Sequence, residues 1–185
     1  VMSLRYFFEE LPDLHVIAAG SLLEFILHDI SFPVGRVHHL HMYPMTFLEF
    51  LLARGNETAS GIIDRPPAQL PDAQHETLLQ ELKRYFLVGG MPGCIVAFNQ
   101  SESVADVFEV QADLITSFID DFGKYAGHAD KKCLEDVFRG ISKGIGSQVT
   151  YSTLTREFTH PTIKKALTLL TKAKIVHPVP SVGLI

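Results

Sequence analysis

The feature that most constrains the fold is a helix-start signal placed directly after a short apolar run, which occurs twice between residues 15 and 52. In the first copy, Val16–Ala19 is apolar and stops at Gly20, as a strand buried on both faces of an α/β sheet does. Ser21 and Glu24 then have the spacing of a capping box, in which two side chains bind free backbone N–H groups at the helix start. The pattern predicts a strand followed at once by a helix.

The second copy has the same order of signals. Residues Val37–Met42 have the composition of a strand, and a Tyr-Pro pair ends the run. Thr46 and Glu49 then have the spacing of a second capping box. Two strand-to-helix transitions in succession predict an α/β fold with a parallel sheet.

Two polar residues in this stretch are candidates for contact with a ligand. The residue after the carboxyl end of a parallel strand faces the ligand crevice, so Ser21 could touch a phosphate or an attacking water. Capping its own helix is the simpler role for Ser21, and the two roles can coexist. Arg36 follows Gly35 at a tight turn, and its planar guanidinium suits phosphate recognition. A surface salt bridge is the alternative role for Arg36.

Four segments carry a resemblance to a known family: VIAAGSLLEF, FPVGRV, MYPMTFLEFLL and YFLVGGMPGCIVAF. In this order, over nearly the whole chain, they resemble the prokaryotic AAA-type P-loop ATPases whose core is followed by a C-terminal region of unknown function. The resemblance implies that residues 1–54 are the C-terminal part of the ATPase core, and that a full-length parent hydrolyses ATP with Mg²⁺. It places Ser21 as the sensor of the γ-phosphate. It places Arg36 near the nucleotide, in its own subunit or in that of a neighbour in a homo-oligomer.

The chain nevertheless lacks the segments that hold a nucleotide in such proteins. No G-x-x-x-x-G-K-S/T string occurs, and the nearest glycine cluster, Gly140–Ser147, has its lysine in the wrong place. Ser117–Asp121 imitates the acidic magnesium-binding strand, but apolar residues keep helical spacing straight through it. Because the chain also begins inside an apolar segment, we expect a fragment of a longer protein. This fragment should neither bind ATP tightly nor hydrolyse it.

The middle of the chain divides at a stretch rich in proline. Between residues 55 and 74, three prolines exclude a continuous helix, and we predict an irregular linker there. Residues 75–130 are predicted to form a helical lid or connector. Its first helix ends at Gly89-Gly90 as a left-handed cap, and a long second helix spans residues 102–122.

Residues 131–185 are predicted to form a separate unit of three helices and a strand. After the first helix the chain turns at Gly144–Ser147, a short second helix covers 152–158, and a third begins near Thr159–Pro161. Ile175–Val179 is apolar and contains a proline, which is typical of an edge strand. This order predicts a winged helix, the helix-turn-helix variant whose third helix enters the major groove of DNA.

The third helix carries the residues that such a unit would present to DNA. Thr162, Lys164, Lys165 and Thr168 lie off its apolar stripe and could meet phosphates or base edges. This unit carries 9 Lys and Arg against 3 Asp and Glu, while the first 130 residues carry 7 against 18. The positive charge favours double-stranded DNA as a partner. The alternative is a winged helix that packs against protein, with these residues merely solvated.

The composition fits a cytoplasmic protein. The chain has 185 residues, of which 46% are hydrophobic, so it can bury a sizeable core. No apolar run approaches the roughly 18 residues of a membrane span, and no secretory signal opens the chain. Cys94 and Cys133 stand far apart and outside any C-x-x-C motif, which predicts neither a disulfide nor a zinc framework. His39 and His41 would share one face of the predicted strand while His38 points away. No third ligand is visible on that face, which favours packing or surface hydrogen bonding over a metal site.

Two functions from different classes follow as hypotheses. One is an AAA-type ATPase, active in the full-length parent and coupled to a DNA-binding winged helix. The other is a non-enzymatic DNA-binding or protein-interaction module in which the α/β half is only a scaffold. The resemblance extends to a nuclease-like part after the winged helix, whose catalytic carboxylates would follow Ile185. A phosphate loop upstream of Val1 would decide for the ATPase.

Overall fold

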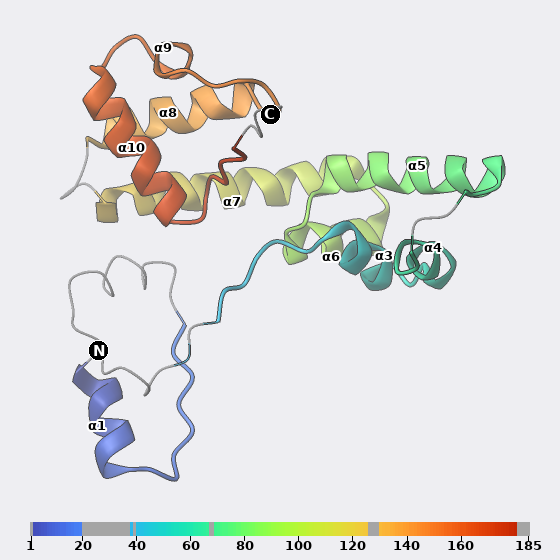
Figure 1. Cartoon of the computed structure of the whole chain (residues 1–185), viewed down its shortest axis with the longest axis horizontal. Helices are drawn as coiled ribbons and strands as arrows, with labels where there is room; N and C mark the ends of the chain where they lie inside the picture. Colours follow the sequence, from blue (N-terminus) through green and yellow to red (C-terminus); the bar gives the residue numbers. More distant parts are fainter. Residues whose placement is uncertain (1, 20–37, 39, 67–68, 126–129, 181–185) are drawn as a thin grey trace. The chain divides into compact units, whose positions relative to one another are not determined.

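A computed structural model describes residues 2–19, 38, 40–66, 69–125 and 130–180 of the chain. All regular secondary structure within these residues is α-helical (Figure 1). The chain divides into two compact units, one made of Val1–His39 with Ile119–Ile185 and the other of Leu40–Phe118. Every helix in the described ranges is too short or too polar to traverse a lipid bilayer.

The helices range from a single turn to the 22 residues of α7, which belongs to both units. Their bounds in chain order are α1 Met2–Glu10, α3 Phe47–Ala53, α4 Glu57–Ile63, α5 Asp72–Val88, α6 Pro92–Ser101, α7 Val104–Tyr125, α8 Lys131–Lys143, α9 Tyr151–Leu154 and α10 His160–Lys172.

The predicted α/β fold, with part of a P-loop ATPase parallel sheet, is wrong for the described residues, which contain helices and no strand. Val16–Ala19 has no regular structure, and Ile17 is 97% exposed. The described part of the second predicted strand is equally open, with Leu40 91% and Met42 95% exposed. A strand is stable only when neighbouring strands satisfy its backbone groups and cover its side chains. No described segment pairs in this way with either run.

The predicted helix start at Thr46 is confirmed. The Thr46 N–H donates to Glu49 Oε2 at 2.7 Å, and the Glu49 N–H donates to Thr46 Oγ1 at 3.3 Å, which completes a capping box for α3. The backbone N–H and then the hydroxyl of Thr46 lower the pKa of Glu49 below its ordinary value. Phe50 and Leu51 are fully buried and anchor α3 in the core of the Leu40–Phe118 unit.

The predicted end of the helix before Gly89 is also confirmed. α5 stops at Val88, and Gly89 has a φ of +75°, although its ψ of −178° differs from the predicted left-handed cap. Gly90 is required for space, because a Cβ there would lie 2.3 Å from the Met45 carbonyl oxygen. The Met45 N–H donates to the Gly90 carbonyl at 2.7 Å, and the Tyr85 hydroxyl donates to the Met45 carbonyl at 2.8 Å. The main chain of Met45 therefore joins the start of α3 to the end of α5.

A helix lies inside the stretch that the sequence predicts to be an irregular linker. α4 begins after Asn56, whose side chain accepts a hydrogen bond from the Ala59 N–H at 3.1 Å. Ala59 packs in the same core as α3, and Ser60 is buried as well. Because both buried residues are small, the sequence shows no apolar stripe that would predict this helix.

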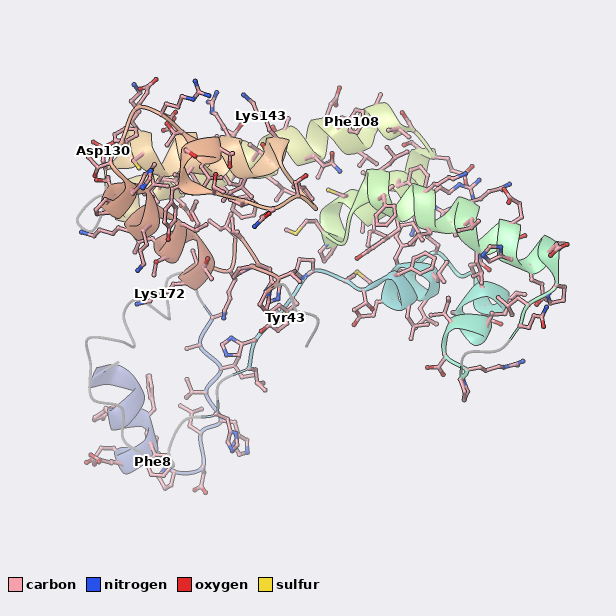
Figure 2. The ribbon with its side chains drawn as sticks, turned by 45° about the horizontal axis from the view of Figure 1, so that its top comes forward. Phe8, Tyr43, Phe108, Asp130, Lys143 and Lys172 are labelled. Atoms are coloured by element: carbon pink, nitrogen blue, oxygen red, sulfur yellow. The ribbon has the colours of Figure 1, made fainter. Side chains whose placement is uncertain are left out.

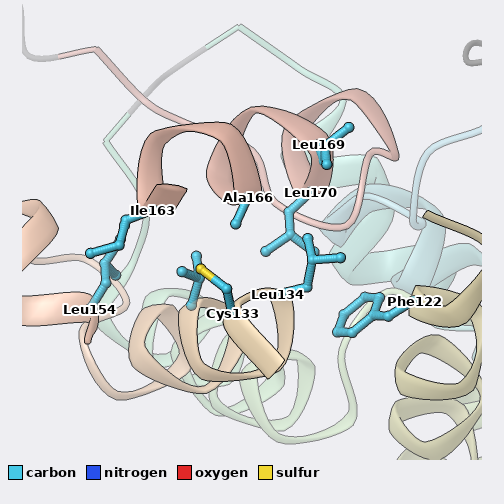
Figure 3. Packing of buried hydrophobic residues seen from close by; sticks show 9 residues of the cluster. Phe122, Cys133, Leu134, Leu154, Ile163, Ala166, Leu169 and Leu170 are labelled. Atoms are coloured by element: carbon cyan, nitrogen blue, oxygen red, sulfur yellow. The ribbon is translucent and has the colours of Figure 1, made fainter. Parts of the chain in front are cut away.

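Helices α8, α9 and α10 form a three-helix bundle around one apolar core (Figure 3). The three helices and the turn at Gly144 are confirmed, but α9 is shorter than the predicted 152–158. Ser117–Asp121 lies within α7, as its helical spacing predicts. The core is built from all three helices and the end of α7, through Phe122, Cys133, Leu134, Val137, Leu154, Ile163, Ala166, Leu169 and Leu170.

The predicted edge strand Ile175–Val179, which would form the wing, is wrong, because this segment has no strand. Lys174 has a φ of +59°, so the chain turns back, and the next two backbone N–H groups donate to the Leu170 carbonyl at 3.1 and 3.3 Å. These donors satisfy the C-terminus of α10 instead of a sheet, and Pro178 has no N–H to offer. The described part of the C-terminal unit is therefore a helical bundle without a wing.

Candidate nucleic-acid interface

α9 and α10 form a helix-turn-helix in which α9 ends at Leu154 and α10 begins at His160. Within the turn, the Glu157 N–H donates to Thr155 Oγ1 at 3.2 Å. Pro161 occupies the first turn of α10, where an N–H would have no partner inside the helix and the fixed φ of proline is already helical. Local hydrogen bonding and proline thus set where α10 starts.

Besides the shared apolar core, two specific contacts hold α8 against this helix-turn-helix. At Gly140, α8 and α9 approach so closely that a Cβ on this residue would lie 2.3 Å from the carbonyl oxygen of Leu154. Near the start of α8, Lys132 forms an ion pair with Glu157 of the turn, and the hydrogen bond and negative charge of Glu157 raise the pKa of Lys132. Both side chains are exposed, so the ion pair orients the turn and adds little stability. The backbone contact at Gly140 is the stronger constraint.

Three of the four residues predicted to meet DNA are exposed on α10. Lys164, Lys165 and Thr168 lie opposite the buried side of the helix. The Thr168 hydroxyl donates to the Lys164 carbonyl at 2.8 Å, which leaves its oxygen available as an acceptor. Thr162 is half-buried, and its hydroxyl oxygen lies 2.9 Å from that of Thr159 in a shared hydrogen bond. Thr162 therefore sits at the edge of the exposed side.

Two further cations enlarge this region. Lys172 is exposed one turn after Thr168, at the i+4 position on the same side of α10. Arg156 is exposed in the turn that precedes α10. Neither is among the residues predicted from the sequence, although the spacing from Thr168 to Lys172 is visible there. We call Lys164, Lys165, Thr168 and Lys172 the α10 face.

The α10 face is basic, and α10 contains no Asp or Glu. Among the described residues, no carboxylate pairs with any of its three lysines. The acidic residues of the bundle lie on α8 and in the turn, where Glu135 and Glu157 pair with other lysines. Unpaired cations on a surface free of acids create a positive potential that attracts a polyanion.

The described residues do not fit ATP and Mg²⁺. Ser21 and Arg36, which the resemblance places at the nucleotide, lie outside the described residues. The glycine cluster Gly140–Ser147 does not wrap a phosphate, because its first glycine is inside α8 and packs on Leu154. In the same ranges, no three His, Cys, Asp or Glu side chains gather to hold a metal ion.

The most buried charge in the described part of the chain belongs to the Leu40–Phe118 unit. The side chain of Glu81 is 8% exposed, and its Oε2 lies 3.8 Å from Nε of Arg54, which is 14% exposed. Arg54 also donates to Asn99 Oδ1 at 3.2 Å and lies over the Phe98 ring at 4.7 Å. Arg84, which is 47% exposed, pairs with the other oxygen of Glu81. These contacts tie α3, α5 and α6 together and serve the fold.

Comparison with known proteins places the chain in one family. A family profile described as "Domain of unknown function (DUF8612)" matches residues 79–184, which is more than half of the chain. The match begins within α5 and includes the whole α10 face, but neither Ser21 nor Arg36. The resemblance to AAA-type ATPases therefore stays a prediction. No curated protein and no solved structure matches the chain. The chain belongs to the DUF8612 family, which is defined by a domain of unknown function.

Proposed function

We propose that residues 130–180 form a DNA-binding module that places α10 in the major groove of duplex DNA. The observation that most supports this is the α10 face, whose lysines have no ion-pair partner in the described residues and which contains no acid. α10 also follows a short helix and a turn, as the recognition helix of a helix-turn-helix protein does. Its 13 residues make a rod about 20 Å long, which suits a groove roughly 12 Å wide.

In this module the lysines and threonines have different roles. The lysine side chains bind phosphate oxygens, which gives affinity for any sequence and releases counterions. Thr168 offers a hydroxyl oxygen to base edges, and Thr162 lies at the edge of the same surface. Hydroxyl groups can accept or donate at either base of a pair, so their contribution is to sequence preference.

Fluorescence anisotropy of the full chain with a labelled duplex at several salt concentrations tests this proposal. Replacing both Lys164 and Lys165 by Gln should weaken binding to every sequence and flatten the salt slope by about 2, since each phosphate contact contributes about 0.9. Thr168→Val should change mainly sequence preference.

The matched control is the double variant Arg65→Gln, Lys83→Gln, which removes the same charge from exposed positions of the Leu40–Phe118 unit. It should leave DNA affinity unchanged or slightly raise it, because these cations lie outside the module. Equal losses in the two double variants would show a nonspecific charge effect and reject the proposal. Absence of salt-sensitive binding at low ionic strength would reject it too and favour a protein-interaction module.

Two wider expectations are also proposals. A cytoplasmic location agrees with Cys94 and Cys133, which are free and buried. Membership of a larger AAA-type ATPase rests on the sequence resemblance alone. In an ATP-hydrolysing parent, Ser21→Ala or Arg36→Ala should lower kcat by at least roughly tenfold while leaving nucleotide affinity nearly unchanged, as loss of a transition-state contact requires. Unaltered turnover would assign both residues to helix capping and surface pairing.

A further inference from the structure

α8 has a second basic surface on the side of the bundle away from α10. The two helices pack through their apolar faces, so their outward faces point in opposite directions (Figure 3). Figure 2 shows Lys143, at the end of α8, and Lys172, at the end of α10, on opposite sides of the bundle. Arg139 and Lys143 are both exposed, one turn apart on α8. We call Arg139 and Lys143 the α8 face.

The cations of the α8 face are available to a ligand. Within the described residues, neither Arg139 nor Lys143 pairs with a carboxylate, whereas Lys132, further back on the same side, is held by Glu157. Asp136 lies one turn before Arg139 and forms no ion pair with it. Glu135, also one turn before Arg139, pairs with Lys131 instead. The guanidinium of Arg139 and the ammonium of Lys143 thus stand together without an ion-pair partner in the described residues, which is a combination suited to phosphate oxygens.

We propose that the α8 face binds the backbone of a second duplex while the α10 face binds the first, so that one molecule bridges two DNA segments. This inference rests on the proposed function of α10. Two packed helices are roughly 20 Å thick. That thickness is about twice the Debye length at 0.1 M salt, so the repulsion between the two duplexes is largely screened. Because the α8 face offers charge without a set of base-reading side chains, the second contact is independent of sequence.

A capture assay with the full chain tests the bridge. The protein is first bound to an immobilised duplex and washed, and a fluorescent duplex of unrelated sequence is then added. The wild type should retain the second duplex. The double variant Arg139→Gln, Lys143→Gln should retain at least about tenfold less, because two phosphate contacts are lost. Its affinity for one duplex in solution should stay within about twofold of the wild type, since the α10 face is intact.

The remaining outcomes separate this inference from the proposed function. The variant Arg65→Gln, Lys83→Gln should bridge as well as the wild type. A wild type that saturates the first duplex but captures no second one would overturn the bridge alone, whereas a wild type that binds no duplex would overturn both proposals. If Arg139→Gln, Lys143→Gln bridges normally and light scattering shows a dimer, self-association explains the capture and the α8 face has no such role. If this variant instead loses affinity for a single duplex, both faces contact the same DNA and the bridge is rejected.

Discussion

Replacing Arg54 by Met should strongly destabilise the Leu40–Phe118 unit, because the buried Glu81 carboxylate then keeps only the half-exposed Arg84 as a cationic partner among the described residues. Arg54 Nε is the cationic group that faces Glu81 Oε2, an oxygen that accepts no hydrogen bond from any described residue. Methionine keeps an unbranched apolar stem over the Phe98 ring, so the substitution removes charge and hydrogen bonding more than packing.

The size of the effect follows from how deeply the pair is buried. Removing one partner of a buried ion pair costs about 3 to 5 kcal/mol. Loss of the hydrogen bond from Arg54 to Asn99 adds about 1 kcal/mol. The second cation on Glu81 gives a matched comparison, because Arg84 is half-exposed and Arg84→Met should therefore cost only about 0 to 1 kcal/mol.

Cys94 provides an assay that reports on this unit alone. Its side chain is fully buried in the same core as α3, and burial raises the pKa of its thiol, so reagents reach it only when the unit opens. Thiol labelling across a urea gradient, with peptide masses separating Cys94 from Cys133, gives the unfolding midpoint. A loss of 3 kcal/mol or more should shift that midpoint by about 2 M for Arg54→Met. The Arg84→Met midpoint should shift by well under about 1 M.

A double variant separates the buried charge from other causes. Arg54→Met combined with Glu81→Leu removes both members of the pair, so it should recover at least half of the stability lost in Arg54→Met. Equal midpoint shifts for Arg54→Met and Arg84→Met, or a double variant less stable than Arg54→Met, would refute the reasoning that the burial of Glu81 sets the cost.

Three other predictions concern separate parts of the protein. Gly140→Ala should destabilise the C-terminal bundle by about 1 to 3 kcal/mol, because its Cβ would overlap the Leu154 backbone. Labelling of the Cys133 thiol in urea would measure this loss of stability. Gly123→Ala, with nothing within 4 Å, should be neutral or stabilising by up to about 1 kcal/mol, and equal losses at both glycines would contradict the contact. Because hydrogen bonds from Thr46 lower the pKa of Glu49, its stabilisation is complete above the ordinary glutamate pKa and is lost as pH falls towards the depressed one. The advantage of the wild type over Glu49→Gln in urea midpoint should therefore be full at neutral pH and shrink near pH 3, and a constant difference would contradict it. Calorimetry with Mg-ATP should detect no micromolar binding, since the sequence contains no phosphate loop, and a micromolar Kd would disprove this.

The helices that sequence predicts correctly are those that carry their own hydrogen bonds and a full apolar stripe. α10 is an example, since Pro161 marks its start and Ile163, Ala166 and Leu170 repeat on one face. The capping box at Thr46 is predictable for the same reason, because both of its hydrogen bonds lie within four consecutive residues.

The wrong predictions concern segments whose structure depends on a partner elsewhere in the chain. Four apolar residues at Val16–Ala19 are compatible with a strand, but pairing is a property of two segments and is not encoded in one. Ile175–Val179 has strand composition too, yet its first N–H groups are taken by the end of α10. α4 is missed for the opposite reason, since its buried Ala59 and Ser60 are too small to mark a stripe.

The candidate interface is predicted only in part. Periodicity places Lys164, Lys165 and Thr168 off the apolar stripe, and the structure finds them exposed. Periodicity does not reveal which carboxylates are already paired. Only the structure shows that Glu135 and Glu157 pair with other lysines, and therefore that the lysines of the α10 face have no ion-pair partner in the described residues. The α8 face is not predicted from the sequence, because whether it points away from α10 depends on how α8 and α10 pack against each other.

The open apolar segments near the start of the chain have a consequence for its survival in a cell. Leu14–Ala19 and Leu40–Tyr43 have no regular structure and are rich in exposed apolar side chains. Proteases and holdase chaperones engage exposed peptide of this kind, and here neither has to wait for a helical core to unfold. Turnover that starts at these segments is therefore independent of the free energy of unfolding of the two helical cores. Substitutions that stabilise those cores would leave turnover of this kind unchanged, whereas shielding these two segments would slow it.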